Sequence, residues 1–327
     1  MTDAPRIIPA TGALLDEILD ETYPLWGEGL SRRAYGRLNL AQLRTAWGAA
    51  HLRRLALVSE TGRCLSTAKC YALGARVDGR PVRILGIGAV FTPPDLRGRG
   101  FAAHLIEHLL DEGKQQGFEL AMLFSAIGPG YYQRFGFEPV PVEQVSLTVR
   151  RPPGAPAVPV RAGVDRDVPF LAQMHDARAA ASGWRFALER EPEFIRFAIT
   201  RKRLLAGLGP PGLRHIDYFV VDEGERPAAY AVLLRSDGDR LLTECADRDP
   251  TGARLGALLQ ALFARTPGEY APVVRAWLPP GFRPPQVSVI RVEQPAVVMM
   301  LRPLQSGAAV TPPLTAADVA YWLGDVV

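Results

Sequence analysis

Apolar positions in the first 150 residues follow two different periods. Short runs rich in apolar and β-branched residues predict strands, whereas longer runs with apolar residues three or four positions apart predict amphipathic helices. The resulting order, β-α-α-β-β-β-α-β-α-β, indicates an α/β fold with a mixed sheet. Residues 23–37, rich in glycine and aromatic residues, are expected to form a loop or a broken helix. Strands are expected at residues 6–9, 55–59, 64–75, 82–92, 120–124 and 145–149, and helices at 11–22, 40–49, 102–116 and 131–135.

After residue 160 the chain repeats this order more loosely. The proline-rich stretch 151–159 blocks both helices and strand ladders, so we place the domain boundary there and expect domains at 1–150 and 160–304. The apolar residues 289–301 fit either a last hairpin in the core or an interface. The other elements of this half are expected as helices at 167–180 and 251–264 and strands at 218–222, 228–235, 240–246 and 273–277.

The end of the chain has the pattern of a third piece. Thr311 begins a short proline-containing linker, and Thr315 with Asp318 has the spacing of a capping box, which opens a helix. We therefore expect residues 311–327 to form a helical tail, with the helix running through Leu323. Its apolar face favours a docked tail over a frayed one.

Composition limits the class of protein. At 327 residues the chain is long for one core, and 48% hydrophobic with 22% charged residues describes a globular protein. The sequence lacks both a membrane-length apolar run and the pattern of a signal peptide. A net charge of +4 without a basic, aromatic patch does not indicate nucleic acid. Cys64, Cys70 and Cys245 fit neither a zinc site nor a disulfide framework, so we expect a cytoplasmic protein.

The most specific motif is Arg97-Gly-Arg-Gly-Phe-Ala102, between the apolar strand 84–92 and the helix 102–116. Glycines let the backbone approach a ligand closely and adopt positive φ, and the free N–H groups of a first helical turn carry partial positive charge. A strand that passes through glycines into a helix therefore predicts a cradle for a phosphate or pyrophosphate. A simple chain reversal would need one glycine rather than two flanked by arginines.

Two other interpretations of this region fit less well. Gly98-x-Gly100-x-x-Ala103 matches the dinucleotide-binding fingerprint, but that fingerprint follows the first strand of a parallel β-α-β unit, whereas hairpin-connected strands precede it here. His104-Leu-Ile-Glu-His108 has the spacing of a zinc peptidase. A solvated polar helix face accounts for these residues, so no metal site is expected.

Residues 90–102, Val-Phe-Thr-Pro-Pro-Asp-Leu-Arg-Gly-Arg-Gly-Phe-Ala, resemble the acetyl-CoA motif of the GNAT superfamily of N-acetyltransferases, Gln/Arg-x-x-Gly-x-Gly/Ala. Residues 131–137, Tyr-Tyr-Gln-Arg-Phe-Gly-Phe, are similar to the second signature of that family, aromatic-Tyr-x-x-x-Gly-Phe. The resemblance implies a GNAT fold for an active first domain and a degenerate GNAT-like second domain. Tandem domains of this kind occur in mycothiol synthase and in the enhanced-intracellular-survival aminoglycoside acetyltransferases.

The same resemblance implies that acetyl-CoA is the co-substrate. Backbone groups at the end of the strand would pair with the pantetheine arm like an added strand, and N–H groups of the glycine loop would hold the pyrophosphate. Tyr132 would be the catalytic residue, acting as a hydrogen-bond donor or general acid toward the leaving thiolate. The implied cofactor-binding residues are Val90, Phe91, Thr92, Arg97, Gly98, Arg99, Gly100, Phe101, Ala102 and Ser125.

The second half has no equivalent cradle. Arg248-Asp-Pro-Thr-Gly252 occupies the corresponding place, but Pro250 removes one backbone donor and the paired glycines are absent. We therefore expect a copy that does not bind the cofactor.

The acceptor implied by the resemblance is a primary amine, either of a small molecule or of a protein or peptide. Trp26 and Glu28 lie where the family builds its acceptor pocket. Candidate bases are Glu28, the C-terminal carboxylate of Val327 and Asp325 beside it; the latter two require the tail to fold back to the N-terminal site. The alternative function is a non-catalytic acetyl-CoA sensor, which the presence of Tyr132 disfavours.

Overall fold

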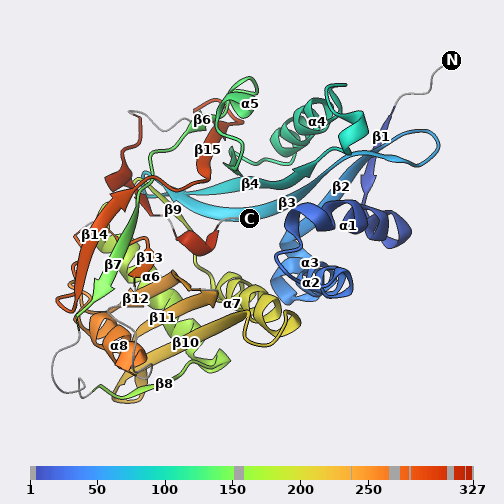
Figure 1. Ribbon diagram of the computed structural model, residues 1–327. Helices are drawn as coiled ribbons and strands as arrows, with labels where there is room; N and C mark the ends of the chain where they lie inside the picture. Colours follow the sequence, from blue (N-terminus) through green and yellow to red (C-terminus); the bar gives the residue numbers. More distant parts are fainter. Residues whose placement is uncertain are drawn as a thin grey trace. The chain divides into compact units, whose positions relative to one another are not determined.

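The computed structural model describes residues 5–150, 158–236, 238–264, 273–279, 281–307, 313–320 and 322–325. The chain divides into two compact units (Figure 1). Unit 1 contains residues 1–140 and 296–313, and unit 2 contains residues 141–295 and 314–326. Each unit thus combines segments from both halves of the sequence, so the boundary does not lie in the proline-rich stretch where we expected it.

The sheet of unit 1 is mixed, as the sequence indicated. Its strands pair in the order β1-β2-β3-β4-β5-β15-β6, and all neighbours are antiparallel except β4 and β5, which run parallel. The strands are β1 (Arg6–Pro9), β2 (Leu52–Val58), β3 (Cys64–Val77), β4 (Arg80–Phe91), β5 (Leu120–Ser125), β15 (Val298–Pro303) and β6 (Glu138–Pro139).

Helices cover both faces of this sheet (Figure 1). The apolar side of α4 (Phe101–Gln115) buries Leu105 and Leu109 completely against Leu85 of β4 and Met300 of β15. On the other face, Ile18 of α1 (Gly12–Trp26) packs on β2. The remaining helical elements of unit 1 are α2 (Arg32–Arg44), α3 (Ala46–His51), the 3-10 turn η1 (Pro94–Leu96) and α5 (Gly130–Gln133).

The sheet of unit 2 has the order β14-β7-β13-β12-β11-β10-β8, with β12 and β13 parallel. Helices α6 (Val168–Ser182) and α7 (Pro192–Leu208) share one buried cluster with β10 and β11. A third helix, α8 (Ala253–Ala264), follows β12. The strands are β7 (Gln144–Val149), β8 (Val160–Ala162), β10 (Arg214–Glu223), β11 (Arg226–Ser236), β12 (Asp239–Asp247), β13 (Val273–Ala276) and β14 (Val287–Glu293).

The two sheets exchange strands along the sequence. The expected strand at 145–149 exists as β7, but it pairs with β13 and β14 in unit 2. The hairpin interpretation of 289–301 is wrong, because β14 joins unit 2 whereas β15 pairs with β5 in unit 1. Unit 2 therefore contains β7, which was expected in the first domain, and unit 1 contains β15, which was expected in the second.

Other expectations fail at segment ends. Residues 23–37 are largely helical, since α1 continues to Trp26 and α2 begins at Arg32. Helix α7 and the short strand β9 (Phe186–Leu188) were not expected from the sequence.

The tail is a further correction. Asp318 accepts hydrogen bonds from the backbone N–H and the hydroxyl of Thr315 at 2.7 Å, which confirms the capping box. It caps only the 3-10 turn η3 (Ala316–Asp318), because the next residues form strand β16 (Val319–Ala320) parallel to β9. A second 3-10 turn, η4 (Leu323–Asp325), follows. In the described chain no helix is both long and apolar enough to cross a membrane.

We expect Met300→Ala to destabilise unit 1 by about 2–5 kcal/mol, because the substitution leaves a cavity in a fully buried cluster. Arg302→Ala, on the same strand but half-exposed, should cost less than about 0.5 kcal/mol. Hydrogen exchange in β4 and β5, measured at increasing denaturant concentration, gives the unfolding free energy of unit 1 in each variant. Equal effects of the two variants would contradict the placement of β15 in the core of unit 1.

Candidate functional site

Strands β4 and β5 diverge at their carboxyl ends. Their parallel pairing runs only from Ile84 opposite Leu120 to Ile87 opposite Leu123. Beyond this point β5 continues to pair with β15 on its other side, through Ser125. After Ile87 the main chain of β4 no longer pairs with β5. The backbone N–H and C=O groups along this edge of the strand therefore have no partner in β5.

A β-bulge accompanies the divergence. Opposite β3, Gly88 pairs with Lys69 and Phe91 with Thr67, so β4 carries one more residue than its partner over this stretch. Ala89 lies there with φ 47°, in the left-handed region that non-glycine residues rarely adopt. Bulges bend a strand and increase its twist, so this one turns the end of β4.

The glycine loop leads from the end of β4 into α4. Gly98 and Gly100 have φ values of 78° and 84°, and a Cβ placed on either would meet no atom within 4 Å. The N–H of His104 donates to the Gly100 carbonyl at 3.0 Å as the first bond of the helix. The N–H groups of residues 101–103 precede that bond and point out of the helix start, which makes an open anion-binding site.

The two arginines of the loop differ in their contacts. Arg97 donates from Nε to the Thr92 carbonyl at 3.3 Å and so ties the loop to the end of β4. Arg99 is also exposed. The loop start is braced by an ion pair between Arg63 and Asp95 at 2.5 Å.

Thr92 and Phe91 are held by a residue that the sequence did not single out. The Ser66 hydroxyl on β3 donates to the Phe91 carbonyl at 3.0 Å, and the Thr92 hydroxyl donates to Ser66 Oγ at 3.2 Å. Ser66 is completely buried. Its position opposite the strand end is a consequence of the β3–β4 register, which the sequence alone did not show.

Ser125 does not face an opening, contrary to expectation. Its side chain is 1% exposed, and its hydroxyl donates to the Gly128 carbonyl at 2.5 Å. It therefore fixes the turn between β5 and α5, the helix that carries Tyr132.

Tyr132 packs on the core of unit 1. It is half-buried and belongs, with Val90, to the partly buried residues that pack on the core cluster containing Ile87 and Leu123. Burial, with a smaller contribution from Tyr131, raises its pKa to about 12. Among the described residues the Tyr132 hydroxyl has no hydrogen-bond partner, so a protonated donor is available for a ligand.

Trp26, the last residue of α1, approaches the end of β4. Its ring centroid lies 6.1 Å from that of Phe91 in an edge-on arrangement. Glu28 is exposed, with φ 48°, in a turn closed by the Leu30 N–H on the Gly27 carbonyl at 2.8 Å. The structure therefore brings Trp26 to the strand end, with Glu28 in the turn that follows.

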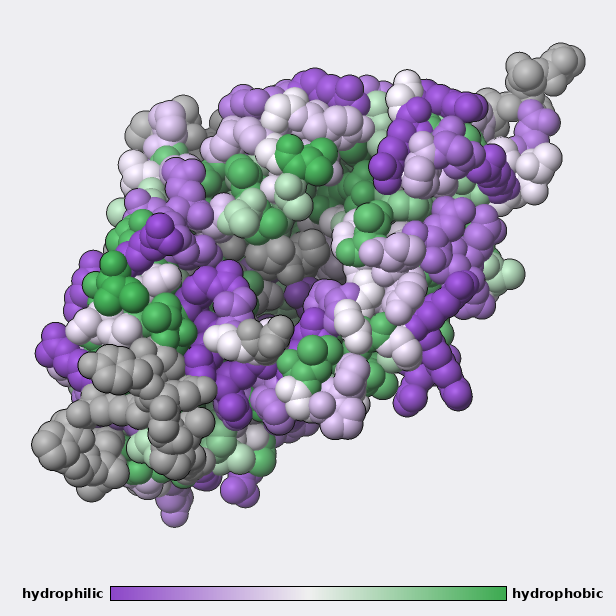
Figure 2. All heavy atoms as spheres, in the orientation of Figure 1, coloured by the Kyte–Doolittle hydropathy of each residue, from purple (hydrophilic) through white to green (hydrophobic). Residues whose placement is uncertain are grey.

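The polar side of α4 carries the residues that have the spacing of a zinc peptidase. His104, Glu107, His108 and Asp111 are exposed, and Figure 2 shows hydrophilic residues along the upper edge of the view, over this helix. The described residues include no group of three or more His, Cys, Asp or Glu side chains placed to hold a metal ion. All three cysteines are buried and unpaired.

The corresponding loop of unit 2 is filled. The Asp247 carboxylate accepts hydrogen bonds from the N–H groups of Leu255 in α8 and of Asp249, both at 2.8 Å. Gly252 has φ 81°, but a Cβ there would lie 2.5 Å from the Phe282 ring. A protein carboxylate and an aromatic ring thus occupy the helix start that is open in unit 1.

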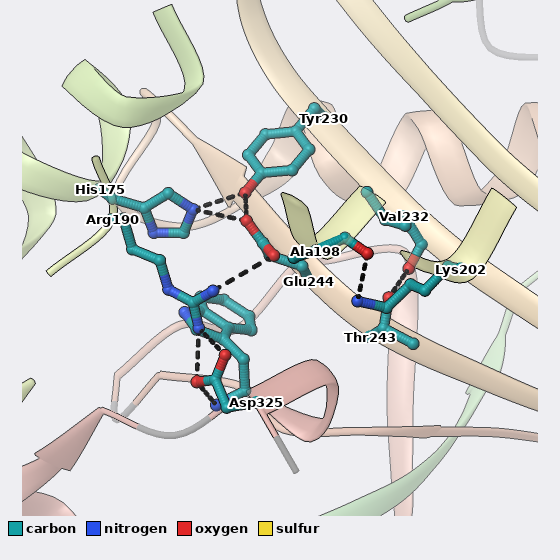
Figure 3. Close-up of polar contacts among 10 residues, drawn as sticks. His175, Arg190, Ala198, Lys202, Tyr230, Val232, Thr243, Glu244 and Asp325 are labelled. Atoms are coloured by element: carbon teal, nitrogen blue, oxygen red, sulfur yellow. Dashed lines mark hydrogen bonds and ion pairs between the residues drawn. The ribbon is translucent and has the colours of Figure 1, made fainter. Parts of the chain in front are cut away.

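Unit 2 also contains a buried polar cluster that the sequence did not predict (Figure 3). Glu244 accepts from the Tyr230 hydroxyl at 2.6 Å and from Arg190 at 3.3 Å, and His175 lies 2.5 Å from that hydroxyl. Burial lowers the pKa of Lys202, which donates to the Ala198 carbonyl, to about 8. Such clusters give no sequence signal because their members come from separate elements.

This cluster corrects one expectation for the catalytic base. Asp325 is 4% exposed and accepts hydrogen bonds from Arg190 at 2.5 Å on both carboxylate oxygens. A buried carboxylate that is paired in this way is not available to an amine. Val327 lies outside the described residues.

A family model described as "Acetyltransferase (GNAT) domain" matches residues 21–140 of the chain. This segment contains β4, the glycine loop, α4 and α5. The search against curated protein sequences gave no match.

Solved structures share the fold over almost the whole chain. A GCN5-related N-acetyltransferase from Kribbella flavida is 20% identical, with a TM-score of 0.66 over 94% of this chain and 73% of that one. A probable N-acyltransferase from Enterococcus faecalis is 16% identical, with a TM-score of 0.67 over 94% and 74%. Eis1 from Mycobacterium abscessus is 16% identical, with a TM-score of 0.55 over 93% and 74%.

The family match coincides with the part of unit 1 in which two parallel strands diverge beside an open helix start. The neighbours extend the same fold to the second sheet. Residues 21–140 therefore match the GNAT acetyltransferase domain family, and the chain as a whole has the fold of solved GCN5-related N-acetyltransferases.

Proposed function

We propose that unit 1 is an N-acetyltransferase that transfers the acetyl group of acetyl-CoA to a primary amine by direct attack in a ternary complex. The observation that carries this proposal is the divergence of β4 from β5 immediately before the open glycine loop. The free edge of β4 suits an extended thioester arm, and the adjacent glycine loop suits a polyanionic headgroup.

The residues present fit acetyl-CoA as a co-substrate. The backbone of Val90, Phe91 and Thr92, released from β5, would pair with the amide groups of the pantetheine arm by strand addition. The N–H groups of residues 97–102 would hold the pyrophosphate, with positive charge from the exposed Arg97 and Arg99.

Tyr132 is proposed to stabilise the departing sulfur. The amine nitrogen attacks the thioester carbonyl carbon, the C–S bond breaks, and negative charge collects on the thiolate. A phenol with a pKa of about 12 gives its proton to a thiolate of pKa near 8.5 only at a cost of about 5 kcal/mol. Tyr132 therefore acts as a hydrogen-bond donor to the thiolate and keeps its proton.

The acceptor is proposed to approach from the side of Trp26, past the end of β4. A lysine-like amine with a pKa near 10.4 is only about 0.04% neutral at pH 7, a barrier of about 4.6 kcal/mol, so a base is required. Glu28, exposed in the turn after Trp26, is proposed to attract the cationic amine and to receive its proton through water.

A non-catalytic acetyl-CoA sensor is the second candidate function. A sensor would need the same glycine loop to bind acetyl-CoA, but it would not need a hydrogen-bond donor such as the Tyr132 hydroxyl. The half-buried Tyr132, with its hydroxyl available to a ligand, favours the enzyme.

We expect acetyl-CoA to bind the wild-type chain and Gly100→Trp to weaken binding by at least about 100-fold, because the indole fills the space before the α4 N–H groups. Gly79→Trp is the matched control. Gly79 also has positive φ and open surroundings, but it lies in the β3–β4 turn. Calorimetry measures all three; folded wild-type protein that does not bind acetyl-CoA would overturn the proposal.

Tyr132→Phe is expected to lower kcat by about 100-fold with little change in the KM for acetyl-CoA, because the donor acts on charge that develops during the reaction. Tyr131→Phe, which removes the neighbouring hydroxyl, should retain activity. Free-thiol release is measured with free lysine, a polyamine, an aminoglycoside and a peptide N-terminus. Binding without thiol release from any of these amines would establish the sensor instead.

The raised pKa of Tyr132 predicts that its phenol ionises at a higher pH than an ordinary tyrosine. The difference in ultraviolet absorbance between wild type and Tyr132→Phe should show phenolate forming near pH 12 rather than near pH 10. Since the folded-state pKa is the higher one, the stability contributed by the neutral phenol is complete below pH 10 and is lost as the pH rises toward 12. A midpoint near 10 would show that the ring is not buried.

A further inference from the structure

Unit 2 repeats the strand divergence of unit 1. Strands β12 and β13 pair in parallel only at Leu241 opposite Arg275 and Leu242 opposite Ala276. Immediately afterwards β12 carries a bulge, because Leu233 of β11 pairs with Leu242 whereas Val232 pairs with Glu244. The extra residue is Thr243. The second sheet therefore has the same short parallel ladder, followed by the same kind of irregularity, as β4 and β5.

The chain's own C-terminal segment lies at this divergence. Gly324 in η4 packs on β12 so closely that a Cβ there would lie 3.0 Å from the Thr243 carbonyl and 2.8 Å from Lys202 Nζ. The ring of Trp322 meets Trp277, the residue after β13, with centroids 4.8 Å apart. The segment thus contacts β12 on one side of the divergence and the continuation of β13 on the other.

A buried guanidinium anchors the end of this segment. Arg190, 4% exposed, donates to both carboxylate oxygens of Asp325 at 2.5 Å and to Glu244 of β12 at 3.3 Å. The Trp322 N–H donates to the same Asp325 carboxylate at 3.3 Å. Figure 3 shows Asp325, Arg190, Glu244 and Tyr230 as one connected series of polar contacts. The cluster therefore binds the carboxylate of the segment at position 325.

The segment otherwise has little regular structure to hold it in place. Its described residues form two 3-10 turns and the two-residue strand β16, which pairs with the three-residue strand β9. The strands β10, β11 and β12 pair with one another over most of their lengths without it. Segments with few backbone hydrogen bonds can open while a core remains folded.

We propose that the divergence of β12 and β13 is a peptide-binding site whose ligand is the C-terminal segment of this chain, bound reversibly through Asp325 on Arg190 and Trp322 on Trp277. Asp247 and Phe282 fill the start of α8, which corresponds in unit 2 to the glycine loop of unit 1.

Hydrogen exchange on the full chain tests reversible binding. In the wild type, amides of residues 313–325 should exchange at least about 10-fold faster than those of β11, because the segment opens without unfolding the sheet. Asp325→Asn should accelerate exchange in the segment by a further 10-fold or so and leave β11 unchanged. Asp318→Asn, which removes an acid from the capping box of the same segment, is the matched control and should have a smaller effect.

Two results would overturn the proposal. The first is exchange of the segment and β11 at one common rate in the wild type. The second is faster exchange in both the segment and β11 of Asp325→Asn. Either result would show that the segment unfolds together with the core of unit 2. Unchanged exchange in unit 1 confirms that the variant is folded.

Binding in trans tests the site itself. A labelled peptide with the sequence of residues 316–325 should bind saturably to full-length Asp325→Asn at up to about 1 mM, because its own tail competes weakly there. Wild type should bind at least about 10-fold more weakly, and so should a peptide with asparagine at the last position. Equal binding of the two peptides, or no binding of the unmodified peptide to Asp325→Asn, would contradict the proposal that the site recognises the carboxylate of residue 325.

Discussion

The short parallel ladder between β4 and β5 is the constraint on which the rest of unit 1 depends. The ladder stops at Ile87 and Leu123, and the bulge at Ala89 turns β4 away from its neighbour. A longer ladder would satisfy the backbone groups of residues 88–91 within the sheet. Because it stops, β4 leads with free backbone groups into the open helix start of α4. The half-buried Tyr132 packs on the core cluster that contains Ile87 and Leu123.

The two units use this construction in different ways. In unit 1 the loop glycines have open space beside them, so the N–H groups of α4 can receive an anion. In unit 2 the equivalent N–H groups are bonded to Asp247, Phe282 covers Gly252, and the C-terminal segment lies at the strand divergence. Arg190 supplies a matching charge and two hydrogen bonds that offset the cost of burying Asp325, and the Trp322 N–H donates a third hydrogen bond. The same short parallel ladder is thus followed by an open helix start in unit 1 and by a filled one in unit 2.

Strand exchange explains why the expected domain boundary was wrong. The prolines at 151–159 do break regular structure, but the strand before them, β7, belongs to the second sheet. Likewise β14 and β15 have the alternation of a hairpin and pair in different sheets. Alternation shows that a strand has one buried face, yet it does not say which neighbour provides the hydrogen bonds.

The sequence by itself determined what depends on neighbouring residues. It predicted most strands and helices, the positive φ values of Gly98 and Gly100, and the capping box of Thr315 and Asp318, since each follows from local sterics or short-range hydrogen bonds. Tertiary structure decided the membership of β7 and β15, the burial of Ser125 and the raised pKa of Tyr132. It also decided the pairing of Arg190 with Asp325, which are 135 residues apart. Such contacts depend on which surfaces meet when the chain packs, and no local pattern encodes that choice.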